Sequence, residues 1–275
     1  MDLQTKASLH KELLAFLRTK KFLILVCVII GWSVVSPLMI VGLGLMVDSM
    51  SDLYSEFGVD MSGMTEELTS SASLGVASQI SDISGVGVIV FLLVINSFAG
   101  GEQKKRSIII PQSAGLSSFS YITPKFIVYP ITIFILSFIG TIAAGVVSGF
   151  VFDENDLVFT NVVNAGILLG VSNMFYVCIH LTIGTGTGKP RISSAICIGA
   201  LLLLPGFFVL ADANPAFNPF TINTAAAAAV FGNVSSSGMF IGIIVALVLM
   251  VALYYIALFA QNARKIDNSG NEVLI

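Results

Sequence analysis

A short polar stripe inside an apolar stretch holds the side chains of this sequence that are best suited to chemistry. Asn173, Tyr176 and His180 are spaced three and four residues apart, which places them on one face of a helix. Amide, phenol and imidazole groups can line a path for a polar solute, and they can equally hydrogen-bond to neighbouring helices. Asn96, in another apolar stretch, has the same two interpretations. The sequence leaves both open.

Residues 184–189 partly match the sequence motif of a phosphate-binding loop. The run from Gly184 to Lys189 is rich in Gly and Thr, but that motif needs a Gly where this chain has Ile183 and a Ser or Thr where it has Pro190. The run also follows an apolar stretch rather than a strand, so we interpret it as a flexible turn. The sequence contains no Ser-His-Asp set, no paired catalytic carboxylates, no metal-ligand spacing and no nucleic-acid patch. We therefore expect a chain that is not an enzyme, binds no cofactor or metal and has no nucleic-acid partner.

The composition predicts that the helices carrying these groups cross a membrane. Hydrophobic residues make up 56% of the chain and charged residues 11%, whereas soluble domains have about 25% charged residues. Helices need roughly 20 apolar residues to cross the bilayer, and no run alternates as a barrel strand would. We therefore predict an all-α, polytopic, single transmembrane domain over 1–275 with six spans, at 22–47, 86–100, 126–151, 162–185, 193–211 and 240–261.

No Lys, Arg, Asp or Glu lies in the middle of the spans drawn in this way. The second span is short, and its helix is expected to start earlier, near Gly75 or Ser78. That start would place Asp82 at the outer interface or slightly inside it. An ion-coupled pump usually needs a buried ionisable group, so this arrangement argues against one.

Charge sorts between the two sides of the predicted membrane. All 13 Lys and Arg residues precede the first span, follow the sixth, or lie between the second and third or the fourth and fifth. The positive-inside rule therefore places both termini and these two loops in the cytoplasm. The opposite side receives an acidic loop at 48–84 and a second loop at 212–238, where X-Pro breaks and an alanine run predict a short helix.

Two cytoplasmic segments have distinctive patterns. Residues 8–19 predict an amphipathic helix lying on the membrane lipid, with an apolar side and a polar side. The apolar side is Leu9, Leu13, Phe16 and Leu17, and the polar side is His10, Lys11, Glu12 and Arg18. Residues 101–125 predict a short helix at 102–110, followed by a turn that contains proline. Its polar residues, expected to face solvent or a partner, are Glu102, Lys104, Lys105 and Arg106.

Together these elements resemble the membrane subunit of type-2 ATP-binding-cassette exporters. The resemblance covers essentially the whole chain and depends on the architecture and on the segment from Glu102 to Lys125. It implies a multi-pass permease of a prokaryotic cell membrane that has no ATPase of its own. Such a permease works with a second copy or a related permease and with cytoplasmic ATPase subunits, which bind ATP and Mg²⁺.

The resemblance also implies which residues contact the ATPase. The amphipathic helix would be the elbow helix of the family, with His10, Lys11 and Arg18. The segment beginning at Glu102 would be the coupling helix, with Glu102, Lys104, Lys105, Arg106 and Ser107. Asn96, Asn173, Tyr176 and His180 are the candidates for lining the path.

Two other classes remain as alternatives. A secondary transporter would work without an ATPase, and it usually has an internal repeat or a buried charge, neither of which the sequence indicates. An intramembrane enzyme would need a catalytic constellation, which the sequence lacks.

Overall fold

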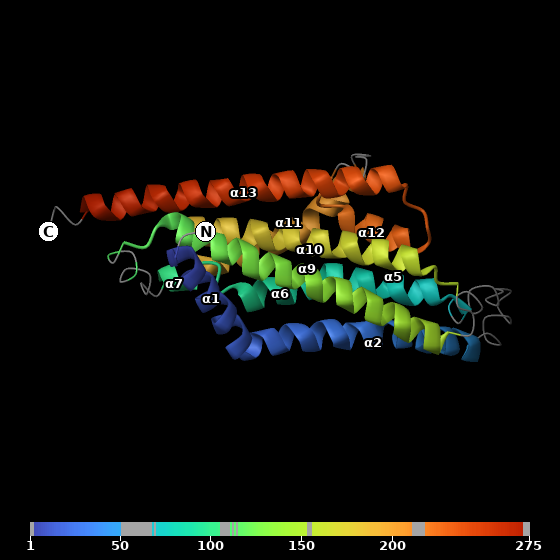
Figure 1. The fold of residues 1–275 in the computed structure, drawn as a ribbon. Helices are drawn as coiled ribbons and strands as arrows, with labels where there is room; N and C mark the ends of the chain where they lie inside the picture. Colours follow the sequence, from blue (N-terminus) through green and yellow to red (C-terminus); the bar gives the residue numbers. More distant parts are fainter. Residues whose placement is uncertain are drawn as a thin grey trace.

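The computed structural model is a bundle of long helices (Figure 1). It describes residues 3–50, 68, 70–104, 111, 113, 115–152, 156–210 and 218–271. Within this part of the chain, six helical stretches are long and apolar enough to cross a membrane. They belong to α2 (Lys20–Ser49), α5 to α6 (Ala72–Ile95), α9 (Ser118–Val151), α10 (Phe159–Thr187), α11 (Pro190–Leu210) and α13 (Ser236–Asn271). The prediction of an all-helical protein with six spans is confirmed.

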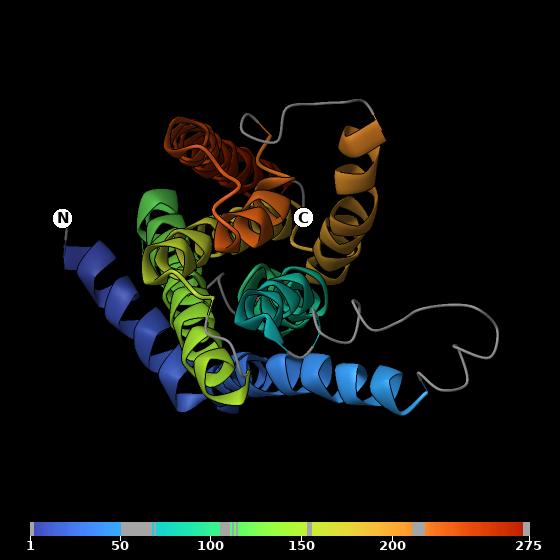
Figure 2. The ribbon, with the colours of Figure 1, turned by 90° about the vertical axis from the view of Figure 1, so that its right-hand side faces the viewer.

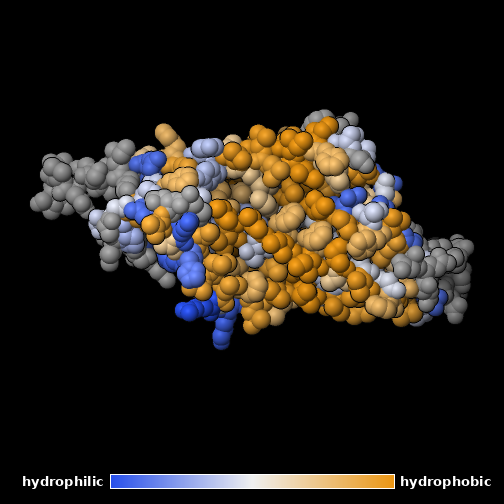
Figure 3. Space-filling model, in the orientation of Figure 1, coloured by the Kyte–Doolittle hydropathy of each residue, from blue (hydrophilic) through white to orange (hydrophobic). Residues whose placement is uncertain are grey.

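The two ends of the bundle differ in charge. On the face shown in Figure 3, hydrophobic side chains form a band across the middle, with polar side chains at either end. Helix α1 (Leu3–Arg18), the short helix α7 (Gly101–Lys104), the start of α9 and the end of α13 all lie at one end (Figure 1). We call this the basic end, because the Lys and Arg residues of the described chain lie there.

Helix α10 forms the centre of the bundle. It packs against α9, α11, α12 (Ile222–Val230) and α13, and the view along the bundle shows these helices around it (Figure 2). The apolar window of α10 is 72% buried, compared with 17% for α13 and 22% for α11. Side chains on α10 therefore lie mostly inside the chain, whereas α11 and α13 present most of their surface to the surroundings.

The second span starts earlier than the apolar pattern predicts. Helix α5 (Ala72–Asp82) begins at Ala72, because Asp156 caps it: the carboxylate accepts hydrogen bonds from the Ser73 N–H and from the Ser71 hydroxyl, both at 2.9 Å. A π-helical turn, η1 (Ile83–Gly87), and α6 (Val88–Ile95) complete the span. The predicted outer loop at 48–84 is correspondingly shorter, and its residues 51–67 and 69 lie outside the described chain.

This start places Asp82 well inside the second span rather than at its edge. At 1.5 Å per residue, Asp82 is about 15 Å along the helix from Ala72. A 30 Å hydrocarbon layer is half crossed at that depth. The expectation that no Lys, Arg, Asp or Glu lies in the middle of a span is therefore wrong at Asp82.

Two further boundaries differ from the sequence pattern. Helix α9 already begins at Ser118, where Ser117 Oγ accepts from the Ser120 N–H at 3.0 Å, so Pro124 lies within the helix and not in a turn. Helix α10 continues through residues 184–187 and ends at Gly188, whose φ of 62° is the left-handed conformation typical of a helix end. These residues are therefore helical rather than a flexible turn. Gly184 is needed there because a Cβ would collide with the carbonyl oxygen of Ala99.

The last outer segment contains a helix of its own. Helix α12 occupies Ile222–Val230, inside the range predicted for the loop at 212–238. Residues 211–217 lie outside the described chain.

Candidate functional site: a charged cluster at the basic end

A buried lysine is the centre of the candidate site. The Lys125 side chain, in the second turn of α9, is 0% exposed. Its Nζ donates to Glu12 Oε1 and to Glu102 Oε2, at 3.0 Å each. Burying an ammonium group without partners is costly, and two carboxylates at this distance compensate for the lost hydration. We call Lys11, Glu12, Glu102, Lys125 and Tyr129 the charged cluster.

Glu12 connects α1 to α9. It is 4% exposed, and its second oxygen accepts a hydrogen bond of 2.5 Å from the hydroxyl of Tyr129. The amphipathic pattern predicts Glu12 on the polar side of the helix; the structure instead turns it inward, on a face shared with Thr5 and Phe16. The spacing in the sequence was compatible with these contacts. Glu12 and Phe16 are four residues apart, as are Lys125 and Tyr129, so each pair lies on one face of its helix.

Glu102 joins the two lysines. Its Oε1 accepts from Lys11 Nζ at 2.7 Å, while its Oε2 accepts from Lys125. Burial alone would raise the pKa of Glu102, but the charges and hydrogen bonds of Lys125 and Lys11 outweigh burial and lower it from 4.5 to about 2. Glu102 therefore stays ionised at neutral pH, and α1, α7 and α9 share one ionic network.

Aromatic rings cover the cluster on its membrane side. Phe98 stacks on Tyr129 with ring centroids 4.8 Å apart, and Phe16 meets the edge of Tyr129 at 5.4 Å. Lys21, at the start of α2, hydrogen-bonds to Ser97, and its Nζ lies 4.5 Å from the centroid of the Phe98 ring. These rings cover the buried part of the network, Lys125 and Glu12, where exclusion of water strengthens the electrostatic interaction, whereas Lys11 stays exposed.

Helix α7 also contacts the last helix. Gln103 Nε2 donates to Gln261 Oε1 of α13 at 2.5 Å. The four residues of α7 therefore touch α1, α9 and α13. A displacement of α7 would act on three of the long elements at once.

The predicted elbow helix is longer than its sequence pattern. Helix α1 spans Leu3–Arg18, and Thr19 is extended, with φ −83° and ψ 145°, so the chain turns sharply before α2 begins. The apolar side divides into two parts: Phe16 is buried against α9, whereas Leu13 and Leu17 are 43% and 48% exposed. The exposed pair is the part of α1 that is suited to contact with lipid.

The residues predicted to contact an ATPase fall into three groups. Lys11 and Glu102 belong to the charged cluster. His10 and Arg18 are exposed on α1, outside the charged cluster. Lys104 ends α7, and Lys105, Arg106 and Ser107 lie outside the described residues. Their coupling role stays a prediction.

The polar stripe on α10 lies inside the bundle. Asn173 Nδ2 donates to Ser137 Oγ of α9 at 2.9 Å, and His180 Nδ1 lies 2.8 Å from Ser193 Oγ of α11. The hydroxyl of Tyr176 and Oδ1 of Asn96 are buried without a hydrogen-bond partner in the described part of the chain. The stripe therefore connects helices of the same chain at two points, and its lining of a path stays a prediction.

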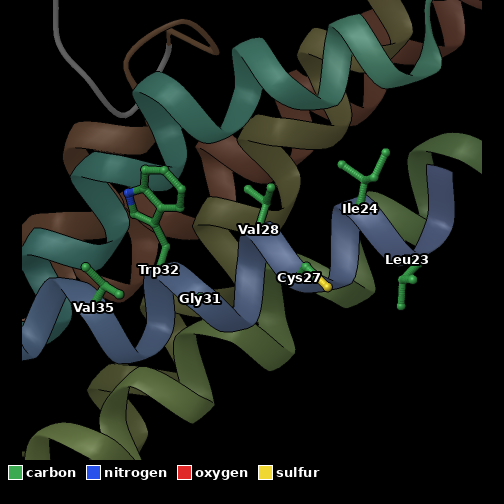
Figure 4. A pocket seen from close by; sticks show the side chains of 7 residues that line it. All are labelled: Leu23, Ile24, Cys27, Val28, Gly31, Trp32 and Val35. Atoms are coloured by element: carbon green, nitrogen blue, oxygen red, sulfur yellow. The ribbon is translucent and has the colours of Figure 1, made fainter. Parts of the chain in front are cut away.

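One groove follows the outward side of the first span. It has a volume of about 390 Å³ and is lined by seven residues of α2 between Leu23 and Val35, among them Trp32 and Gly31 (Figure 4). Its lining is almost wholly apolar, and the residues belong to one helix. Such a shallow apolar depression in a membrane span fits a lipid chain.

Fold and surface together define the class of this protein: it is a multi-pass helical membrane protein. Within the described ranges, no group of three or more His, Cys, Asp or Glu residues could hold a metal ion. Comparison with protein-family models, with curated proteins and with solved structures finds no match.

Proposed function

We propose that this chain is the permease subunit of an ATP-driven exporter. Two copies, or one copy and a related permease, form the path, and separate cytoplasmic ATPase subunits supply the energy. The resemblance described above motivates the proposal, and the basic end is the side on which those subunits bind.

The observation that supports this function best is the sharing of Lys125 by Glu12 and Glu102. Glu12 belongs to the element expected to be the elbow helix, and Glu102 to the element expected to be the coupling helix. In an ATP-driven permease these two elements receive the force from the ATPase. The ionic network around buried Lys125 fixes both elements to the base of α9. Such a fixed connection is suited to transmit the force, because little of the motion is taken up by side-chain flexibility.

The mechanism that we propose is a lever. ATP binding draws the two ATPase subunits together, and each presses on α7 and the residues that follow it. Because Glu102 holds α7 to Lys125, the push moves the base of α9 together with α1. The tilting of these helices as rigid bodies opens the path between the two permeases outward.

The test of this function is the uncoupling of ATP hydrolysis from transport. The Glu102→Ala and Lys105→Ala variants should insert in normal amounts and leave ATP hydrolysis by the assembled complex intact, yet abolish transport. Lys189→Ala, an exposed lysine at the same end, is the matched control and should transport normally. Unchanged transport by the Glu102→Ala variant would refute the assigned contact.

One observation favours a secondary transporter as the second candidate. Such a protein usually carries an ionisable group inside the membrane, and Asp82 is such a group. A secondary transporter would move its substrate in vesicles that contain this chain alone, with an ion gradient and no ATPase, so that experiment separates the two candidates.

A further inference from the structure

Asp82 and the polar groups near it lie well away from the outer ends of three helices. Its hydrogen-bond partner Ser36 is thirteen residues from the outer end of α2, about 20 Å at 1.5 Å per residue. On α9, Gly140 is about 17 Å from the outer end at Val151 by the same measure. The polar groups around Asp82 therefore occupy the central zone of the hydrocarbon layer.

Within the described chain, Asp82 has one side-chain hydrogen-bond partner and no cationic one. Ser36 Oγ donates to Asp82 Oδ2 at 2.6 Å, and none of the described Lys, Arg or His residues forms an ion pair with Asp82. An ionised carboxylate in hydrocarbon is unfavourable unless a cation accompanies it. Asp82 therefore has one carboxylate oxygen and one unit of negative charge available to bind a cation.

Further oxygen atoms converge on this zone. Gln79, one turn before Asp82 on α5, is 0% exposed, and within the described chain neither its Oε1 nor its Nε2 has a hydrogen-bond partner. Pro37 lacks an N–H, so the carbonyl of Ser33, four residues earlier, has no partner in its own helix. A Cβ on Gly140 would lie 3.3 Å from Ser33 Oγ and 3.6 Å from Gln79 Nε2, so α2 and α5 bring their polar groups to the same point.

The backbone is irregular at the same position. The π-helical turn η1 starts at Ile83, directly after Asp82. Turns of this kind shift the hydrogen-bond register of a helix and are frequent at functional sites. An irregular turn, a proline in the facing helix and a glutamine without a partner in the described chain all occur near one carboxylate.

We propose that Asp82, Ser36 and Gln79 form an intramembrane binding site for one monovalent cation, either a proton or Na⁺. The ligands are all oxygen atoms, which suits these cations and not a soft metal ion. A single carboxylate neutralises one positive charge, so a divalent cation would leave an excess charge in the hydrocarbon. Asp82 is partly exposed in this chain. This site is independent of the proposed ATPase partner.

No other ionisable side chain competes for the cation in the packed elements around Asp82. The helices that pack against α5 are α2, α9 and α12. The groups that face the site are Ser33 and Ser36 from α2 and the Gly140 backbone from α9. Helix α12 contains no ionisable residue, and the nearest ionisable residues along α2 are Cys27 and Asp48, each at least nine positions from Ser36.

The test is labelling of Asp82 by dicyclohexylcarbodiimide, a lipid-soluble reagent that modifies protonated carboxyl groups. The purified protein in lipid nanodiscs is labelled over a range of pH, in NaCl or in choline chloride of equal ionic strength. Mass spectrometry then quantifies the adduct on the peptide that contains Asp82. The experiment needs no substrate and no ATPase, so its outcome does not depend on the proposed transport function.

We expect the adduct on Asp82 to increase as the pH falls. If the natural ligand is Na⁺, NaCl will protect Asp82 relative to choline chloride at the same pH; if it is the proton, the two salts will give the same curve. Asp82→Asn should lose this adduct, whereas Asp48→Asn should keep it. Labelling that depends on neither pH nor Na⁺, or no labelling of Asp82 under any condition, overturns the proposal.

Two serine variants test the ligand set without removing the carboxylate. Ser36→Ala should shift the cation concentration that gives a half-maximal change in Asp82 labelling by about tenfold. The free energy of a hydrogen bond to a charged group corresponds to a change of about that size in a binding constant. Ser81→Ala is the matched control, because Ser81 is exposed and its hydroxyl donates to the Ala77 carbonyl of the same helix, and it should leave the curve unchanged. Equal curves for both variants would exclude Ser36 from the site.

Discussion

Replacing Lys125 by Met tests the energetic centre of the charged cluster. The substitution removes the cation that Glu12 and Glu102 share at 3.0 Å while keeping an unbranched side chain of similar length. Glu12, at 4% exposure, keeps only the Tyr129 hydroxyl at 2.5 Å and the more distant Lys11 Nζ at 4.0 Å. Removing one partner of a buried ion pair costs about 3–5 kcal/mol. We expect a loss of this size in the free energy of unfolding, measured by titration with a denaturing detergent in mixed micelles.

A double-mutant cycle separates the pair from general damage. Glu12→Gln alone should cost about 1–3 kcal/mol, because Lys125 keeps Glu102 as a partner. The double variant should be more stable than the sum of the two losses predicts, by about 1–3 kcal/mol. Lys20→Met, at an exposed lysine, is the control and should change stability by less than about 0.5 kcal/mol. If Lys125→Met costs no more than this control, or if the two losses simply add, the account of the charged cluster is refuted.

Two further predictions concern the same end of the molecule. The pKa of Glu102 is lowered to about 2 in the folded protein from an ordinary 4.5, so the stability that Glu102 contributes is complete above pH 4.5 and is lost as the pH falls toward 2. Glu102→Gln should flatten the pH dependence of the unfolding free energy in this window, and an unchanged slope would contradict the assignment. Gly184→Ala should cost about 1–3 kcal/mol, because the added Cβ collides with the Ala99 carbonyl oxygen. Gly199→Ala, where nothing lies within 4 Å, should be neutral in the same assay, and equal effects of the two variants would exclude the close contact between Ala99 and α10.

The number of spans could be predicted because each depends on the length of one apolar run. The composition and the run lengths predicted six helices, and the structure has six that are long enough. Boundaries were harder to predict, because they depend on residues distant in sequence. Helix α5 begins at Ala72 through a carboxylate supplied by Asp156, 83 positions from its partner Ser73. No pattern local to α5 contains that information.

The charged cluster could be predicted only in part. Its residues lie in segments that the sequence marked as unusual, and Glu102 and Lys125 delimit the segment on which the family resemblance depends. The inward direction of Glu12 is different, because it depends on which face of α1 meets α9. The amphipathic pattern, with Leu13 and Leu17 on one side, predicts that this side contacts lipid. In the structure the face of α1 that packs against α9 is instead the one that carries Phe16 and Glu12.

Asp82 shows how one helix boundary changes a functional interpretation. With the span drawn from residue 86, the carboxylate lies outside the membrane, and nothing argues for an ion site. With the helix starting at Ala72, the same residue faces Ser36 in the centre of the bundle. The small residues at 71–78 made this possible. Gly75, for example, packs so closely that a Cβ there would lie 2.6 Å from Ser148 Oγ and 2.7 Å from the Phe152 ring.

Purification of the native complex through a tag on this chain tests the central claim most directly. The complex is extracted from its own membrane in mild detergent, moved to lipid nanodiscs and assayed for ATP hydrolysis, beside a complex that carries Glu102→Ala. The account predicts an ATPase subunit in stoichiometric amount with this chain, and hydrolysis that persists in the variant while transport is lost. A chain that purifies without any ATPase, and that transports in vesicles on its own, would contradict the account.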